Sequence, residues 1–318
     1  MTAPSRIPWQ AKFLGLALIW GSSFLLMKYG LRALEPVQIA GLRIVGGALT
    51  LLLLLRLGGG SLPQGARTWG HLFVGAIFLT SLPFTLFALG ETRVSSALAG
   101  IGNSITPVSM VVFGLLLLPS ERLTRVKLVA VLLGFIGVLV ISEPWNDVGR
   151  PDPLGFAIVL VAGACYGLGW PYVRRTLAHA DLGGLAQPTA LLLCGTAQML
   201  VVELAFWLLH RGTMRLPWSV HADASGHDAW VALVATLVLG VVGTGLAYML
   251  QFDVVRDAGT VVSSTVTYLI PVVSVVLGVL VLGERIGPMQ LLGFALVLGA
   301  ALLVGRPAAG WASLLRRG

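Results

Sequence analysis

Long apolar runs separated by short polar breaks dominate the pattern of hydrophobic and polar positions along the chain. Each run is close to the roughly 20 residues that an α-helix needs to cross a bilayer. The runs are continuous rather than alternating, and they are far longer than the about ten residues of a barrel strand. The sequence therefore predicts an all-α polytopic membrane protein with ten transmembrane helices, at approximately 13–31, 37–57, 69–89, 94–118, 123–142, 154–173, 182–209, 230–252, 258–282 and 286–304.

One stretch of the chain, 106–122, has a close copy at 270–285. In each copy a proline, Pro107 or Pro271, begins an apolar run, a glycine follows seven residues later, and the run ends at Glu-Arg. The first copy carries one extra residue near Pro119, so it ends in Pro-Ser-Glu-Arg where the second ends in Gly-Glu-Arg. Self-similarity of this kind indicates a tandem duplication.

The duplication extends to the other runs of each half. A shift of 164 residues relates the two proline stretches, and a shift of 146 overlays Trp20-Gly-Ser-Ser-Phe on Tyr166-Gly-Leu-Gly-Trp. Because each half has an odd number of spans, the second half must enter the membrane from the opposite side, which gives an inverted repeat of the kind used for alternating access. We predict a first five-helix repeat at 1–146, a linker at 147–153, a second five-helix repeat at 154–305 and a cytoplasmic tail at 306–318.

The distribution of Lys and Arg favours an orientation with both termini in the cytoplasm. That arrangement leaves 13 of these residues on the cytoplasmic side and seven outside, with Arg43 inside a span. Cytoplasmic loops of membrane proteins carry the excess of positive charge. We therefore expect a multi-pass protein of the cell membrane with a cytoplasmic N-terminus and C-terminus.

Composition and motifs narrow the class of protein. Of the 318 residues, 57% are hydrophobic and only 11% are charged, which a water-exposed globular surface could not tolerate. The net charge of +8 is scattered singly between apolar runs, so nucleic acid is not an expected partner. Cys165 and Cys194 fall inside apolar runs and are expected to be buried thiols. The sequence has no phosphate loop, zinc-type spacing or serine-hydrolase elbow, so we expect no enzyme activity, cofactor or metal.

The order and spacing of these features resemble the EamA family of the drug/metabolite transporter superfamily. Each half has an aromatic-Gly-x-x-aromatic motif in its first span and a Pro-to-Glu-Arg stretch at its fourth, and Leu42-Arg43-Ile44 fits the family's Leu-Arg-Phe-like pattern. The resemblance covers almost the whole chain. It implies secondary transport of small metabolites, often export of amino acids or related compounds, through a central cavity lined by helices 1, 3, 4, 6, 8 and 9. The second half has no arginine that matches Arg43.

Charged residues inside the spans need a specific reason, since a charge in hydrocarbon costs about 2.5–3.5 kcal/mol on insertion scales. Arg43 lies near one end of its span, and we interpret it as a structural residue that snorkels to the interface or caps neighbouring carbonyls. Glu203, deep in the seventh span, is a candidate for proton coupling. A structural pairing of Glu203 is the favoured alternative, because the family's cavity does not normally include this helix.

Aromatic and weakly polar side chains recur on the spans that the resemblance places around the cavity. The aromatic residues at helical spacing predict the wall of a substrate site, and the polar ones its few hydrogen bonds. Helix packing and an interfacial aromatic belt are the alternatives. The candidate substrate-binding residues are Trp20, Ser23, Phe24, Phe84, Asn103, Thr106, Tyr166, Trp170, Tyr248, Gln251, Thr267 and Tyr268, with Pro107 and Pro271 as candidate hinges.

The functional hypothesis is a secondary carrier that exports a small amphipathic metabolite, such as an amino acid, through the bilayer, with protons as a candidate coupling ion. One alternative is a membrane-embedded enzyme that acts on lipids, which would need a pair of titratable groups at one depth. Arg43 and Glu203 are too few and not obviously paired for that chemistry. A second alternative is a scaffold without transport activity.

Overall fold

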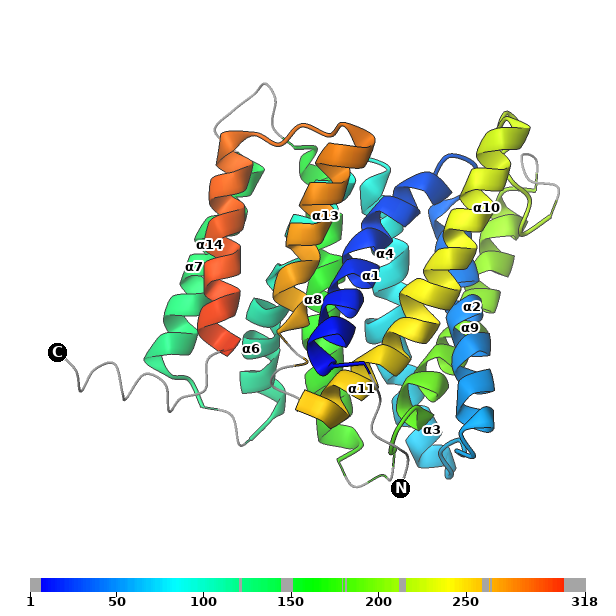
Figure 1. Cartoon of the computed structure of the whole chain (residues 1–318), viewed down its shortest axis with the longest axis horizontal. Coiled ribbons are helices and arrows are strands. Elements are labelled where there is room, and N and C mark those ends of the chain that lie inside the picture. Colours follow the sequence, from blue (N-terminus) through cyan, green and yellow to red (C-terminus); the bar gives the residue numbers. More distant parts are fainter. Residues whose placement is uncertain are drawn as a thin grey trace.

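The computed structural model describes residues 7–119, 122–143, 151–178, 180, 182–211, 216–258, 263 and 265–305. Within these residues all regular elements are helices, and they pack side by side as one bundle (Figure 1). Eight helical segments are long and apolar enough to cross a membrane, and two further apolar helices are shorter. The protein is therefore an all-α, multi-pass membrane protein, as the sequence predicted.

The spans of the first half follow the predicted order. They are α1 (Trp9–Gly30), α2 (Pro36–Leu57), the continuous segment α3 (Ala66–Ala76), η1 (Ile77–Ser81) and α4 (Leu82–Glu91), the pair α5 (Ser96–Asn103) and α6 (Ile105–Leu117), and α7 (Arg125–Ser142). Those of the second half are α8 (Pro153–Thr176), α9 (Ala186–Leu209), the continuous segment α10 (Gly226–Gly240), η2 (Val241–Leu246) and α11 (Ala247–Ala258), then α13 (Val266–Leu282) and α14 (Pro288–Gly305).

The helix ends gather at two opposite ends of the bundle. The lower end in Figure 1 is where α1 begins and α11 ends, and the upper end is where α1 and α4 end. Part of the predicted linker, 147–150, and the whole predicted tail, 306–318, lie outside the described residues. Glu121 of the first proline stretch lies outside them as well.

The third span of each half contains a short π-helical turn that the sequence reading missed. These turns, η1 (Ile77–Ser81) and η2 (Val241–Leu246), lie at positions related by the 164-residue shift. A π-turn inserts an extra residue into the α-helical ladder and is frequent at functional sites. Both halves therefore carry the same irregularity at the same place in the same span.

The fourth span of the first half is interrupted at Ser104, between α5 and α6. Pro107, a candidate hinge, lies in the first turn of α6, where a missing N–H removes no helical hydrogen bond. Pro271 lies inside α13 and cannot donate to the carbonyl of Thr267, four residues before it. The hinge function of the two prolines stays a prediction.

The aromatic-Gly motif of each half has a structural purpose. At Gly21 in α1 an added Cβ would collide with the side chain of Val273 in α13, and at Gly167 in α8 it would collide with Ser109 in α6. The 146- and 164-residue shifts relate one contact to the other. In both, the first helix of one half approaches the fourth span of the other half as closely as only glycine allows.

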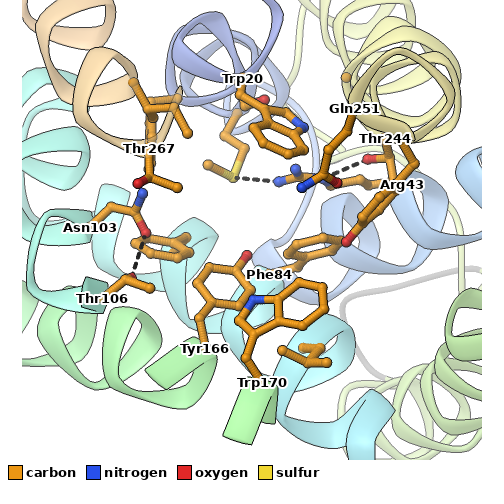
Figure 2. Close-up of a pocket in the computed structure, with 18 of the residues that line it drawn as sticks. Trp20, Arg43, Phe84, Asn103, Thr106, Tyr166, Trp170, Thr244, Gln251 and Thr267 are labelled. Carbon is orange, nitrogen blue, oxygen red and sulfur yellow. Dashed lines mark hydrogen bonds between the residues drawn. The ribbon is translucent and has the colours of Figure 1, made fainter. Parts of the chain in front are cut away.

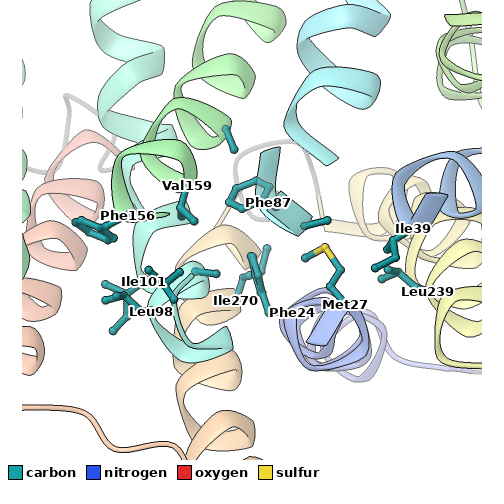
Figure 3. Packing of buried hydrophobic residues seen from close by; sticks show 14 of the residues in the cluster. Phe24, Met27, Ile39, Phe87, Leu98, Ile101, Phe156, Val159, Leu239 and Ile270 are labelled. Atoms are coloured by element: carbon teal, nitrogen blue, oxygen red, sulfur yellow. The ribbon is translucent and has the colours of Figure 1, made fainter. Parts of the chain in front are cut away.

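The largest buried cluster joins the two halves near the upper part of the bundle. Phe24 and Met27 of α1 pack there with Phe87 of α4, Ile101 of α5 and Val159 of α8 (Figure 3). Apolar packing in a membrane gains little from hydrophobicity, because lipid is also apolar, so close van der Waals fit holds these helices together. This packing fixes α1 and α8 opposite each other around the bundle centre.

The predicted orientation of the bundle can be tested with one accessible cysteine. Asp223 is exposed in the connection between α9 and α10, and the native thiols of Cys165 and Cys194 are free and buried, as expected from the sequence. An Asp223→Cys variant should react with an impermeant maleimide in intact cells. Ser225 is a poorer site, because its hydroxyl caps α10 by accepting from the N–H of Asp228. Labelling only after lysis would reverse the predicted orientation.

Candidate functional site

A cavity of about 330 Å³ lies at the centre of the bundle, within the range of small-molecule sites (Figure 2). Its walls come from α1, α2, α8 and from the third and fourth spans of both halves. The structure brings to this cavity all of the predicted binding residues except Tyr268, namely Trp20, Ser23, Phe24, Phe84, Asn103, Thr106, Tyr166, Trp170, Tyr248, Gln251 and Thr267.

Tyr268 does not line the cavity, although its neighbour Thr267 does. Successive residues on an α-helix point about 100° apart, so two neighbours rarely share one narrow face. The sequence interpretation included both because the start of α13, and therefore its facing, could not be fixed from an apolar run. Tyr268 is therefore not among the residues that line this cavity, and its part in substrate binding stays a prediction.

Aromatic rings form much of the cavity wall. Trp20 meets Tyr248 edge to face at 6.2 Å between ring centroids, and Phe84 meets Tyr166 in the same way at 6.5 Å. Figure 2 shows Trp20 and Trp170 on opposite sides of the cavity. Rings in edge-to-face contact support one another and present large, rigid apolar surfaces. Such a wall suits the apolar part of an amphipathic ligand.

Polar groups are few and lie at separate places on the wall. The hydroxyl of Thr106 donates to the carbonyl of Gly163 in α8 at 3.1 Å and lies 3.3 Å from Oδ1 of Asn103. The hydroxyl of Ser23 donates to the carbonyl of Ile19 at 3.3 Å. Two of these hydroxyls are therefore already engaged with the protein, while the amide of Asn103 has donors to offer a ligand.

Arg43 of α2 also lines the cavity, which corrects the expectation that it snorkels to the interface. Its Nε donates to the hydroxyl of Thr244 at 3.0 Å, and its guanidinium carbon lies 3.8 Å from the ring centroid of Phe84. The side chain is 7% exposed. Arg43 lies in the half of α2 that faces η2, so its long side chain reaches the bundle centre rather than the membrane surface.

The π-turns supply part of the wall. Leu79 of η1 and Gly243 and Thr244 of η2 line the cavity. The 164-residue shift places Thr80 on Thr244, but neither was among the predicted site residues. The signal in the sequence for these turns was the threonine repeated at the same place in both halves. Both threonines are buried and lie where the α-helical hydrogen-bond pattern changes to a π-helical turn.

Glu203, the candidate for proton coupling, lies away from the cavity. It is buried in α9 and its carboxylate accepts a hydrogen bond from the indole N–H of Trp218. It also packs against α2, where a Cβ on Gly41 would collide with the carboxylate. These contacts are of the structural kind that the sequence analysis favoured, and within the described residues Glu203 is not part of the cavity lining. Its role in proton coupling stays a prediction.

Glu91 is a buried carboxyl that the sequence reading did not single out. It ends α4, is 0% exposed, and neither of its carboxyl oxygens has a hydrogen-bond partner among the described residues. The ammonium of Lys28 binds the backbone carbonyls of Glu91 and Val94 at 2.6 and 2.9 Å. Glu91, Lys28 and His221 help to line a second cavity of about 330 Å³. The residue was missed because it lies just beyond the apolar run that predicted the span.

With this geometry established, a family comparison identifies the chain. The model of the EamA-like transporter family matches residues 8–143 and 153–306. The chain belongs to the EamA-like transporter family. The family assignment predicted from the sequence is therefore confirmed, and this EamA-like protein is a membrane transporter.

Several proteins named as uncharacterized transporters are similar to this EamA-like chain. The inner membrane transporter YedA of Escherichia coli K12 is 22% identical over 94% of this chain and 90% of its own, and the transporter YvbV of Bacillus subtilis is 25% identical over 91% and 88%. A transporter of Archaeoglobus fulgidus is 32% identical over 158 residues, which are 48% of this chain and 53% of that protein. A solved crystal structure has a TM-score of 0.60 at 19% identity, with 97% of each chain covered, and shows the same fold.

Proposed function

We propose that this EamA-like protein exports a small amphipathic metabolite, such as an amino acid or a related compound, by alternating access through the central cavity. The observation that carries the proposal is the lining of that cavity by side chains from matching spans of both halves. A cavity built at the interface of two repeats is the typical substrate site of secondary transporters. Its aromatic wall with a few separate polar groups suits a molecule that has both apolar and polar parts.

Ion pairs between the two halves support alternating access. At the lower end, Lys12 of α1 binds Asp253 and Asp257 of α11 at 3.3 and 2.6 Å. At the upper end, Arg93 just after α4 lies 3.7 Å from Asp152 just before α8. Each cluster connects the first helix of one half to the third span of the other. Rocking of one half against the other would open the two ends in turn by separating one cluster at a time.

The proposal is tested by transport in a defined membrane. The purified full-length chain, reconstituted into liposomes, should exchange one or more members of a panel of radiolabelled amino acids across the membrane. Empty liposomes and liposomes that contain heat-denatured protein are the controls. Exchange at the rate of empty liposomes for the whole panel would reject amino acids as the substrate class.

The direction of transport is tested separately in membrane vesicles. Everted vesicles, in which the cytoplasmic face is outside, should accumulate a substrate that the protein exports, whereas right-side-out vesicles should not. Vesicles from cells that lack the protein provide the control. Accumulation in right-side-out vesicles would make the protein an importer.

Glu203→Gln should leave the response of transport to an imposed pH gradient unchanged. The amide keeps an oxygen to accept from Trp218, and the residue lies away from the cavity. The measurement compares uptake by wild type and variant in proteoliposomes with and without the gradient. If the variant loses acceleration by the gradient but still exchanges substrate, Glu203 carries the coupled proton.

A further inference from the structure

Arg43 gives the central cavity a positive charge in an otherwise uncharged wall. It is the charged residue among the described lining residues, which are otherwise aromatic, aliphatic, amide, hydroxyl or glycine. A buried charge is normally paired, because hydrocarbon and protein interiors solvate it poorly. The residues around Arg43 therefore show whether its counter-ion belongs to the protein or has to come from a bound ligand.

Among the residues that the structure describes, the contacts of Arg43 leave its charge without an ion-pair partner. Within the described residues its contacts are with neutral groups: the hydroxyl of Thr244 on Nε, the sulfur of Met27 at 4.0 Å from Nη1, and the ring of Phe84 under the guanidinium. No carboxylate of the described chain forms an ion pair with it. The carboxyl of Glu91 interacts electrostatically with Arg43 over a longer range, but Glu91 lies outside the cavity lining, and its backbone carbonyl accepts from the ammonium of Lys28.

The donors of Arg43 suit a planar anion. A guanidinium has five N–H donors in a fixed plane, and the bond to Thr244 uses the one on Nε. Of the remaining donors, one on Nη1 points to the sulfur of Met27, which leaves a second on Nη1 and two on Nη2. These two nitrogens can bind the two oxygens of a carboxylate side by side. The side chain is held by Thr244 and Phe84, so little of its conformational freedom is lost when an anion binds.

The other residues of the cavity wall indicate what kind of molecule carries the anionic group. Trp20, Trp170 and Tyr166 surround the cavity with ring surfaces, and its volume of about 330 Å³ admits only a small molecule. A single guanidinium balances one negative charge, so a phosphate dianion would bring a second charge without a partner. A monocarboxylate with an aromatic or branched apolar body matches both the charge and the surface.

We propose that Arg43 binds the carboxylate of the transported molecule, which makes the substrate an organic monocarboxylate with an apolar body. This inference rests on the proposed function and specifies its substrate class. A purely structural Arg43 would connect α2 to η2 through Thr244 and would give the cavity no preference between an anion and a neutral molecule of the same shape. The two roles therefore differ in a measurable selectivity.

The test uses three probes of nearly the same size and different charge: 3-phenylpropionate, 3-phenylpropanamide and 3-phenylpropylamine. Their binding to the purified full-length protein in detergent is measured by titration calorimetry. The wild type should bind the carboxylate about 10- to 100-fold more tightly than the amide, as expected for hydrogen bonds to a charged group, and the amine least tightly. Equal affinities for carboxylate and amide would overturn the inference.

Two substitutions locate the selectivity at Arg43. Arg43→Gln should reduce the ratio of the affinities for the carboxylate and the amide to near one. Arg43→Lys should keep part of this preference, since lysine retains the charge but not the planar pair of donors. An unchanged ratio in Arg43→Gln would overturn the assignment. If Arg43→Gln does not fold, the affinity ratios of the wild type and of Arg43→Lys still test whether Arg43 is the source of the preference.

The outcome also separates this inference from the proposed function. Transport of the amino-acid panel with equal binding of all three probes would leave the carrier function standing and reject the anion site. Binding of none of the probes by the wild type would reject the monocarboxylate class. Failure of the panel in liposomes, with selective binding of 3-phenylpropionate, would reject amino acids but retain the anion site.

Discussion

Trp20→Ala and Trp170→Ala should each lower the apparent affinity for the transported substrate roughly 5- to 150-fold, while the protein still inserts and purifies normally. The two rings face each other across the cavity, and Trp20 is held edge to face by Tyr248 at 6.2 Å. A tryptophan can bury about 150–250 Å² against a partner, so its removal costs on the order of 1–3 kcal/mol of contact. The measurement is the concentration dependence of transport in proteoliposomes.

Trp230→Ala provides the matched control for loss of an indole ring. Trp230 is 68% exposed near the start of α10, away from the cavity lining, so its removal should leave the concentration dependence unchanged. Unaltered transport by both cavity variants would make Trp20 and Trp170 packing residues and would remove the aromatic wall from the site. Equal losses in all three variants would indicate a general effect of tryptophan on insertion.

The number and order of the spans could be predicted because bilayer thickness and apolar composition impose them. A helix that satisfies its own backbone is the one regular structure that a long continuous apolar run can form in lipid. The duplication was equally visible, since packing keeps special residues in matching places. Gly21 and Gly167 are glycines for one reason, the approach of the fourth span of the other half.

Interruptions within the spans could not be predicted in the same way. The π-turns η1 and η2 and the break at Ser104 depend on how a few residues exchange helical hydrogen bonds, and composition hardly changes there. Pro107 marks the span that is interrupted, but it does not mark the position of the break. The break is at Ser104, and Pro107 lies in the first turn of the helix that follows, α6. Tyr268 was predicted for the site together with Thr267 because an apolar run does not show which face of its helix points to the cavity.

The cavity wall was largely predictable, whereas its charge was not. Aromatic residues four apart, such as Trp20 and Phe24, share a helix face whatever the neighbouring helix is. The direction of a long side chain depends on its neighbours. Arg43 reaches Thr244, about 200 positions further along the chain, and its sequence context alone could not distinguish this contact from snorkelling to the interface.

Two glutamates at the upper end should differ in how the same substitution, Glu→Gln, affects thermal stability. Glu284, in the connection between α13 and α14, accepts from the backbone N–H groups of Ser96 and Ala97 at 2.8 and 2.9 Å and from the Ser96 hydroxyl at 3.1 Å. A carboxylate at the start of α5 also interacts favourably with the helix dipole. Glu284→Gln should therefore lower thermal stability, by about 1–3 kcal/mol.

The matched change Glu91→Gln should leave thermal stability unaltered or raise it. The carboxyl oxygens of Glu91 have no partner among the described residues, so the amide loses no hydrogen bond and removes a potential buried charge. Both variants and the wild type are compared by thermal unfolding in the same detergent. A larger loss in Glu91→Gln than in Glu284→Gln would mean that the charge of Glu91 is stabilised by Lys28 and contributes to holding α1 against α4.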